Sequence, residues 1–173
     1  MKKKAIIISI KSFSLTHKEK LLLLNEKPWG LILFKRNIKS LDQIKSLIKK
    51  IRKLTKDKNF PILIDEEGAT VSRLRNIINH NISASNFGKL YEINDKSCIK
   101  IYKNYLNSLC KILKKIGINI NTIPVLDILR KNTAKVIGER SFSNKKEIVK
   151  KLGKITVAQC HANKILSIIK HIP

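Results

Sequence analysis

The sequence predicts an α/β fold in which helices cover the outer face of a parallel sheet. Short apolar runs alternate along the chain with longer segments whose apolar residues recur every three to four positions. Strands that are apolar at every position are typical of parallel sheets, which are buried on both faces. The chain has 173 residues, of which 43% are hydrophobic, and no repeat, low-complexity tract or linker interrupts it. We therefore expect a single domain over residues 1–173.

The expected strands are uninterrupted apolar runs, and helices lie between them. The strands are expected at 5–10, 30–34, 61–65, 118–124 and 165–170. The helices are expected at about 15–26, 41–56, 95–116 and 145–163. The stretch 66–93 is expected to be one long connection, and connections of that length are usually functional or flexible.

Capping residues support three of these helices. Each begins at a side chain that suits the N-cap position: Ser40 with Gln43, Asn94, and Asn144 with Glu147. Gly117 suits the C′ position after the third long helix, because glycine adopts the left-handed conformation found there.

A net charge of +25 raises the question of nucleic-acid binding. Most basic residues are lysines, which lie off the apolar stripes of the segments 42–55 and 98–116, where a helix faces water. Aromatic residues make up only 5% of the chain, so there is no stacking platform for bases. We interpret the lysines as a solvated surface in a lysine-rich proteome and expect no specific nucleic-acid partner. A basic nucleic-acid binder is the alternative, and its affinity would fall steeply with salt.

The cysteines and histidines show no metal-ligand spacing. Cys98, Cys110 and Cys160 fit neither an even disulfide set nor a zinc pattern, so we expect buried thiols in a reducing compartment. His17, His80 and His161 are expected to be surface or packing residues. The spacing of these residues predicts no metal site, and there is no glycine-rich phosphate loop.

The amino terminus is expected to carry no targeting signal. Its apolar run spans only residues 5–10, which is shorter than the apolar core of a secretory signal, and no cleavage site follows. No segment approaches the ~20 apolar residues of a membrane span. We therefore expect a cytoplasmic protein with no membrane contact.

Polar residues stand at, or shortly after, the ends of four of the expected strands. These are Lys35-Arg36, Asp65, Asp127 and Lys170-His171. The carboxyl ends of parallel strands form the ligand side of both a (β/α)8 barrel and an open doubly wound sheet. Arginine is rare in this chain, so Arg36, Arg73 and Arg140 are candidates for two-pronged hydrogen bonding on that side.

Other charged residues near these strand ends are ambiguous. Asp127 could instead anchor a loop at the end of its strand. Glu66 and Glu67 are expected to be loop or helix-terminus charges.

Five segments, in order, resemble glycoside hydrolase family 3. They are GLILFKRN at 30–37, IDEEGATVSR at 64–73, PVLD at 124–127, IGERSF at 137–142 and KHIP at 170–173. They are similar to the GxILFxRN, DQEGGRVxR, PVLD, IGDRSF and KHFPGHG segments of the family's N-terminal barrel domain. The likeness is greatest to bacterial β-N-acetylhexosaminidases, the β-N-acetylglucosaminidases that recycle peptidoglycan.

The resemblance implies both a fold and a function. The fold would be a partial (β/α)8 TIM barrel with about the first five strands and four helices. Terminal N-acetylglucosamine would be held by Asp65, Arg73, Arg140, Lys170 and His171. Catalysis would proceed by retaining hydrolysis without a cofactor, using a nucleophile and an acid/base that are expected beyond Pro173. The isolated chain is therefore expected to be inactive.

The chain also departs from the family pattern, at Ala69, Thr70, Glu139 and Ile172. A partial barrel would leave apolar strand edges open, which suggests a fragment, a frame-disrupted gene or one half of a split enzyme. In the last case a C-terminal half-barrel chain would be a partner. A non-catalytic sugar-binding or interaction module is a further alternative.

Overall fold

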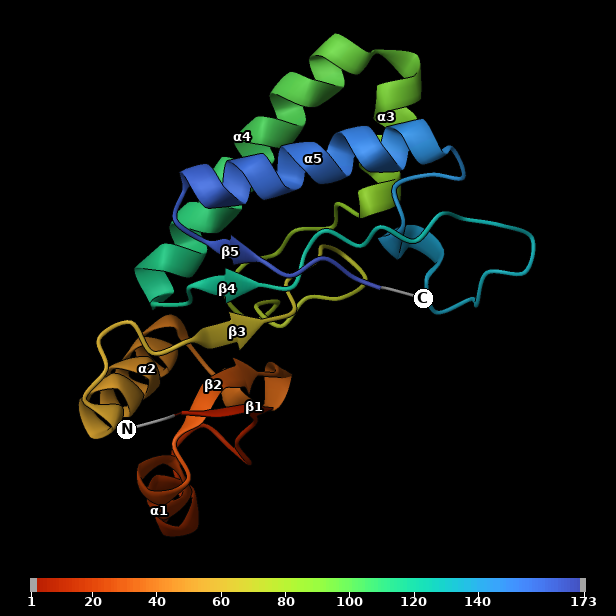
Figure 1. The fold of residues 1–173 in the computed structure, drawn as a ribbon. Coiled ribbons are helices and arrows are strands. Elements are labelled where there is room, and N and C mark those ends of the chain that lie inside the picture. Colours follow the sequence, from red (N-terminus) through yellow and green to blue (C-terminus); the bar gives the residue numbers. More distant parts are fainter. Residues whose placement is uncertain (1–2, 172–173) are drawn as a thin grey trace.

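The structure is a computed structural model and describes residues 3–171. Its strands form one parallel sheet in the order β1-β2-β3-β4-β5. The strands are β1 (Lys4–Ile8), β2 (Pro28–Leu33), β3 (Ile62–Ile64), β4 (Ile120–Asn121) and β5 (Leu166–Ser167). Each strand neighbours the next one along the chain, as in a barrel. All five point the same way, so their carboxyl ends lie on one side of the molecule (Figure 1).

Helices connect the strands and lie along the outside of the sheet (Figure 1). They are α1 (His17–Asn25), α2 (Leu41–Thr55), α3 (Ala84–Ile93), α4 (Asp95–Ile116) and α5 (Lys146–Ala162). The expected Ser40 and Asn94 N-caps are confirmed, since their side chains accept the amide hydrogens of Gln43 and Ser97. Gly117 ends α4 with a φ of 102°, as expected for a left-handed C-terminal residue.

The long connection predicted over 66–93 is wrong in part, because its last ten residues form α3. Ser83 caps this helix by accepting the amide hydrogen of Asn86. The helix packs so tightly that a Cβ on Gly88 would lie 1.6 Å from the carbonyl oxygen of Phe142. A fifth helix therefore joins the four expected ones.

The predicted capping box at Asn144 is also wrong. Helix α5 starts one residue later, with Lys145 at its N-cap and no side-chain cap. The Ser143 hydroxyl accepts the Lys145 amide hydrogen instead. The strands are shorter than the apolar runs as well, because the β4–β5 ladder stops after two residues and pairing resumes only between Val125 and Lys170.

The core lies between the sheet and its helices. Strand residues Leu31, Leu33, Ile62 and Ile64 have no exposed surface and belong to one buried cluster with residues of α2, α4 and α5. All three cysteines are free and buried, as predicted. No helix within residues 3–171 is both long and apolar enough to cross a membrane.

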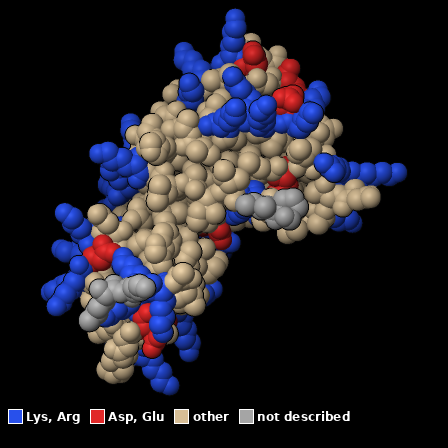
Figure 2. Space-filling view, viewed as in Figure 1, with Lys and Arg blue, Asp and Glu red and all other residues tan. Residues whose placement is uncertain are grey.

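The two edge strands leave apolar side chains exposed. Ile6 and Ile7 of β1 are 51% and 41% exposed, and Leu166 of β5 is 58% exposed. In Figure 2, lysine and arginine side chains project from the outer parts of the molecule, and uncharged residues make up most of the surface between them. The molecule therefore has a charged outer surface and two apolar sheet edges.

Candidate functional site

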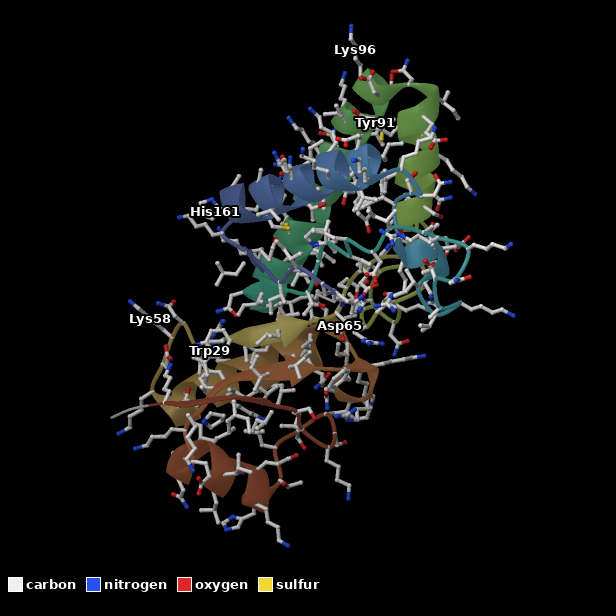
Figure 3. All side chains as sticks on the ribbon, turned by 45° about the vertical axis from the view of Figure 1, so that its right-hand side comes forward. Trp29, Lys58, Asp65, Tyr91, Lys96 and His161 are labelled. Carbon is white, nitrogen blue, oxygen red and sulfur yellow. The ribbon has the colours of Figure 1, made fainter. Side chains whose placement is uncertain are left out.

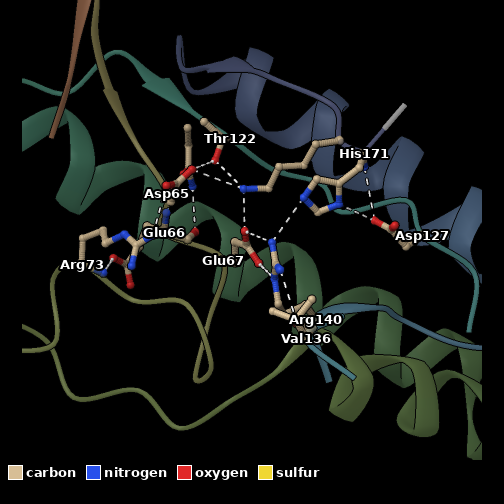
Figure 4. A network of polar contacts seen from close by, with 11 residues as sticks. Asp65, Glu66, Glu67, Arg73, Thr122, Asp127, Val136, Arg140 and His171 are labelled. Atoms are coloured by element: carbon tan, nitrogen blue, oxygen red, sulfur yellow. Dashed lines mark hydrogen bonds and ion pairs between the residues drawn. The ribbon is translucent and has the colours of Figure 1, made fainter. Parts of the chain in front are cut away.

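Polar side chains from three neighbouring strands meet at the carboxyl end of the sheet. Asp65 follows β3, Thr122 follows β4 and Lys170 follows β5, and Asp65 lies near the centre of the molecule in Figure 3. The Thr122 hydroxyl donates to Asp65 Oδ1, and Lys170 Nζ lies 3.3 Å from the same oxygen. Arg73 Nη2 donates to Asp65 Oδ2 at 3.2 Å. The Asp65 carboxylate therefore has donors on both oxygens (Figure 4).

These donors keep Asp65 ionised. Burial alone would raise its pKa, but the Thr122 hydrogen bond, the Lys170 charge and the Arg73 hydrogen bond outweigh it. The pKa of Asp65 therefore lies below its ordinary value. An ionised Asp65 is an acceptor only and suits a ligand that presents hydroxyl donors.

Glu67 connects Lys170, which contacts Asp65, to Arg140 at the other end of the network. Its Oε2 accepts from Arg140 Nε at 2.8 Å, and its Oε1 accepts from Arg140 Nη2 at 3.0 Å. Lys170 Nζ lies 2.5 Å from Oε1. Glu67 lies in the loop after β3, as expected, but its side chain is only 5% exposed and contacts two cations. Its hydrogen bond and charge raise the pKa of Arg140, which burial alone would lower.

The far end of the network is formed by His171 and Asp127. His171 Nε2 lies 3.5 Å from Arg140 Nη2, and His171 Nδ1 lies 2.7 Å from Asp127 Oδ2. Burial would raise the pKa of Asp127, but hydrogen bonds from His171 lower it below the ordinary value. Asp127 thus fixes the orientation of the His171 ring, whose side chain is 44% exposed.

Glu66 also lies in this loop, as expected, and its fully buried side chain supports the loop beneath the site. Its Oε2 accepts the backbone amides of Arg73 and Leu74 at 2.7 and 2.9 Å. Its Oε1 lies 2.8 Å from His80 Nε2. The sequence predicted that His80 is a surface or packing residue. Its contact with the buried Glu66 side chain shows that it is a packing residue. The Glu66 contacts hold the backbone that presents Arg73 to Asp65.

The five residues singled out from the sequence converge. Asp65, Arg73, Lys170, Arg140 and His171 form one connected set through Glu67 and Thr122 (Figure 4). Arg36 is directed elsewhere, because it donates to the Ser9 hydroxyl and the Ile10 carbonyl at the end of β1. Ile172 and Pro173, the end of the KHIP segment, lie outside the described residues.

Sequence reasoning missed Glu66, Glu67 and Thr122. A signal for Glu67 was available, because two carboxylates directly after a buried strand must find donors on the ligand side. For Thr122 there was no signal, because a threonine within an apolar run also fits a strand.

The arrangement suits a polyhydroxylated ligand. All three Lys170 donors are directed at Asp65, Thr122 and Glu67, which fixes the ammonium in place. Arg140 and His171 form the other end of the network, where the His171 side chain is 44% exposed and Arg140 Nη1 donates to the Val136 carbonyl. Within residues 3–171, no group of three His, Cys, Asp or Glu residues could hold a metal ion.

Comparison with known proteins identifies the family. A family model described as the glycosyl hydrolase family 3 N terminal domain matches residues 2–173. The chain belongs to glycoside hydrolase family 3. A β-hexosaminidase from Hydrogenovibrio crunogenus is 30% identical over 168 residues, which is 97% of this chain and 46% of that protein. A β-hexosaminidase from Neisseria gonorrhoeae is 31% identical over 85% of this chain and 40% of its own length.

Solved family 3 structures have the same arrangement of elements. NagZ from Neisseria gonorrhoeae in complex with zinc ion superposes with a TM-score of 0.91 at 28% identity, over 99% of this chain and 51% of that one. The same protein in complex with N-trifluoroacetyl-D-glucosamine gives a TM-score of 0.89 over the same shares of the two chains. The chain thus spans about half the length of the relatives it matches. Its parallel sheet is a partial (β/α)8 barrel, as the sequence predicted.

Proposed function

We propose that this chain forms the sugar-binding half of a family 3 active site that removes terminal β-N-acetylglucosamine from glycans such as peptidoglycan fragments. The observation that supports this most is the convergence of Asp65, Arg73, Arg140, Lys170 and His171 in one network at the carboxyl ends of the strands. That edge is where (β/α)8 enzymes bind substrate. The setting we propose for this activity is the cytoplasm.

In this proposal each group has a role toward the sugar. Ionised Asp65 accepts hydrogen bonds from ring hydroxyls, and Arg73 and Lys170 hold that carboxylate in position. Arg140 and His171 donate to the hydroxyls at the exposed end. Charge-assisted hydrogen bonds are stronger than neutral ones, and those that tighten in the oxocarbenium-like transition state lower the barrier to cleavage.

Bond cleavage itself would need groups outside this chain. Retaining hydrolysis takes a nucleophile and an acid/base about 5 Å apart across the sugar. We place both in the half of the longer relatives that residues 2–173 do not match. A C-terminal half-barrel would supply them as a partner, and the chain alone would bind sugar without cleaving it.

Calorimetric titration of the chain with N-acetyl-D-glucosamine tests the binding claim. We expect saturable binding that weakens at least about tenfold in Arg140→Ala, because a hydrogen bond to a charged group contributes ~1.5–3 kcal/mol. Arg130→Ala is the matched control, since Arg130 is an exposed arginine outside the network. Equal affinity of the two variants, or no saturable binding by the unmodified chain, would contradict the proposal.

A chromogenic assay tests the second claim. We expect no turnover of p-nitrophenyl N-acetyl-β-D-glucosaminide by the purified chain. Turnover that Arg140→Ala abolishes would show that residues within this chain suffice for catalysis, and the proposed division of the site would be wrong.

A further inference from the structure

The aromatic ring of Phe34 contacts two arginines at the carboxyl end of β2. Phe34 directly follows this strand and is half-buried. The Cζ atom of Arg36 lies 4.7 Å from the ring centroid, and that of Arg73 lies 5.6 Å from it. Both distances fall within the ~6 Å over which a guanidinium is attracted to the face of an aromatic ring. Because Arg73 donates to Asp65, Phe34 contacts the polar network through Arg73.

The Arg73 side chain has few other restraints. It lies at the end of the network opposite His171 and is 29% exposed (Figure 4). Within residues 3–171, its only side-chain hydrogen bond runs from Nη2 to Asp65 Oδ2 at 3.2 Å, and its buried Nε has no partner. Arginine–carboxylate pairs are frequently held by two parallel N–H groups, whereas a single hydrogen bond lets the guanidinium turn about that contact. Contact with the Phe34 ring is therefore the second restraint on this guanidinium.

The Phe34 ring is itself held by the segment that follows β1. The Phe34 amide donates to Asn37 Oδ1 at 2.9 Å, and the buried Asn37 side chain donates to the Ile10 carbonyl at 3.0 Å. Arg36 Nε donates to the same carbonyl at 3.0 Å. Arg36, which lies outside the polar network, thus contacts the ring from a fixed position.

We propose that Phe34 is a positioning residue whose aromatic face orients the Arg73 guanidinium so that it donates to Asp65. The proposal deepens the proposed function and rests on it, because Asp65 is the group assigned there to the sugar hydroxyls. Phe34 acts through Arg73 and not by its own contact with the sugar. Without the ring face, Arg73 would turn toward solvent and Asp65 would lose one of its donors.

A stacking platform for the sugar is the alternative role of this ring. Two guanidiniums already lie over the Phe34 ring, which leaves less of its surface to a sugar. The two roles also differ in their effect on Asp65. A platform acts on the sugar alone, whereas a positioning residue changes Asp65 when no sugar is present.

The pKa of Asp65 provides a readout that needs no sugar. Burial raises this pKa, and the hydrogen bond from Arg73 is one of the contacts that lower it. A pH titration of the full chain, followed by ¹³C NMR at the Asp65 carboxyl carbon, would measure it. We expect Phe34→Leu to raise the pKa toward its ordinary value, because leucine is apolar but has no aromatic face. Phe34→Tyr keeps the face and should leave the pKa unchanged.

Three further variants separate positioning from general disturbance. Phe13→Leu is the matched control, since Phe13 is 43% exposed and outside the network, and it should leave the pKa of Asp65 unchanged. In the Arg73→Met background, Phe34→Leu should have no further effect on this pKa, because Phe34 acts only through Arg73. Phe34→trifluorophenylalanine weakens the negative charge on the ring face and nearly preserves its shape. It should raise the pKa of Asp65 even if Phe34→Leu fails to fold.

Calorimetric titration with N-acetyl-D-glucosamine tests the consequence for binding. We expect Phe34→Leu to weaken binding about threefold to tenfold, which is the range of a partly exposed cation–π contact. Phe34→Tyr and Phe13→Leu should keep the affinity within about twofold of the unmodified chain.

The contrary results are distinct. An unchanged pKa of Asp65 in the leucine and fluorinated variants, or an equal rise when Arg73 is absent, overturns the proposal. Weaker sugar binding with an unchanged pKa would assign Phe34 to the sugar itself and overturns it as well. A rise that depends on Arg73, in a chain that binds no N-acetyl-D-glucosamine, would refute the proposed function alone.

Discussion

Glu67→Gln should destabilise the chain more than any other single loss of charge in the network. Glu67 accepts two hydrogen bonds from Arg140 and contacts Lys170, and the side chains of the three residues are only 5%, 12% and 17% exposed. The amide would keep one acceptor oxygen but turn its N–H₂ group toward the Arg140 guanidinium, which contacts both carboxylate oxygens. Removing one partner of a buried ion pair costs ~3–5 kcal/mol. Because Arg140 and Lys170 keep some contact with water, we expect a loss of about 2–4 kcal/mol.

Urea unfolding followed by far-UV circular dichroism would measure this change. For a chain of this size, a loss of that magnitude corresponds to a fall in Tm of about 5–10 °C. Glu139→Gln is the matched control, since Glu139 is exposed and the substitution changes net charge equally. We expect the control to stay within about 0.5 kcal/mol of the unmodified chain. If the two variants were equally stable, Glu67 would not be the centre of the network.

Three further predictions follow from individual contacts. Because the pKa of Asp65 is lowered in the folded chain, its contribution to stability is complete above its ordinary value of 3.8 and is lost as pH falls through the folded value. Asp65→Asn should therefore make stability less dependent on pH below about 4 in acid titrations followed by circular dichroism. Gly88→Ala should destabilise by about 1–3 kcal/mol or more in urea unfolding, because its methyl group would overlap the carbonyl of Phe142; unchanged stability would refute the close contact. Ser40→Ala should cost about 1 kcal/mol through loss of the α2 cap, whereas Asn144→Ala should cost less than about 0.5 kcal/mol. Equal costs for the two would contradict the reassigned start of α5.

The sequence predicted five parallel strands because their apolar runs are unbroken, and polar residues at the ends of four of them indicated the ligand side. The same reasoning failed for α3, whose helical residues include Gly88 and several polar side chains. That helix is stabilised by tertiary contacts, including a close approach to Phe142, and its periodicity alone does not reveal it. The start of α5 was misplaced by one residue because Ser143 and Asn144 both suit an N-cap position.

The site was predictable where a residue follows a strand directly. Asp65, Lys170 and His171 could be placed on the ligand side from position alone. The scarcity of arginine singled out Arg73 and Arg140, but also Arg36, which lies outside the network. The roles of Glu66 and Glu67 depend on partners that are 7 and 73 residues away along the chain. No local pattern reveals which of two adjacent carboxylates turns inward to the backbone and which meets Arg140.

Binding of a saccharide at the network is the central claim, and NMR titration tests it most directly. An ¹⁵N-labelled chain titrated with N-acetyl-D-glucosamine should show saturable shift changes at the amides of Asp65, Arg73, Arg140 and His171. The amides along the outer face of α5 should stay unchanged. Shifts confined to the exposed lysine surface, or absent at those four amides while the chain remains folded, would contradict the account.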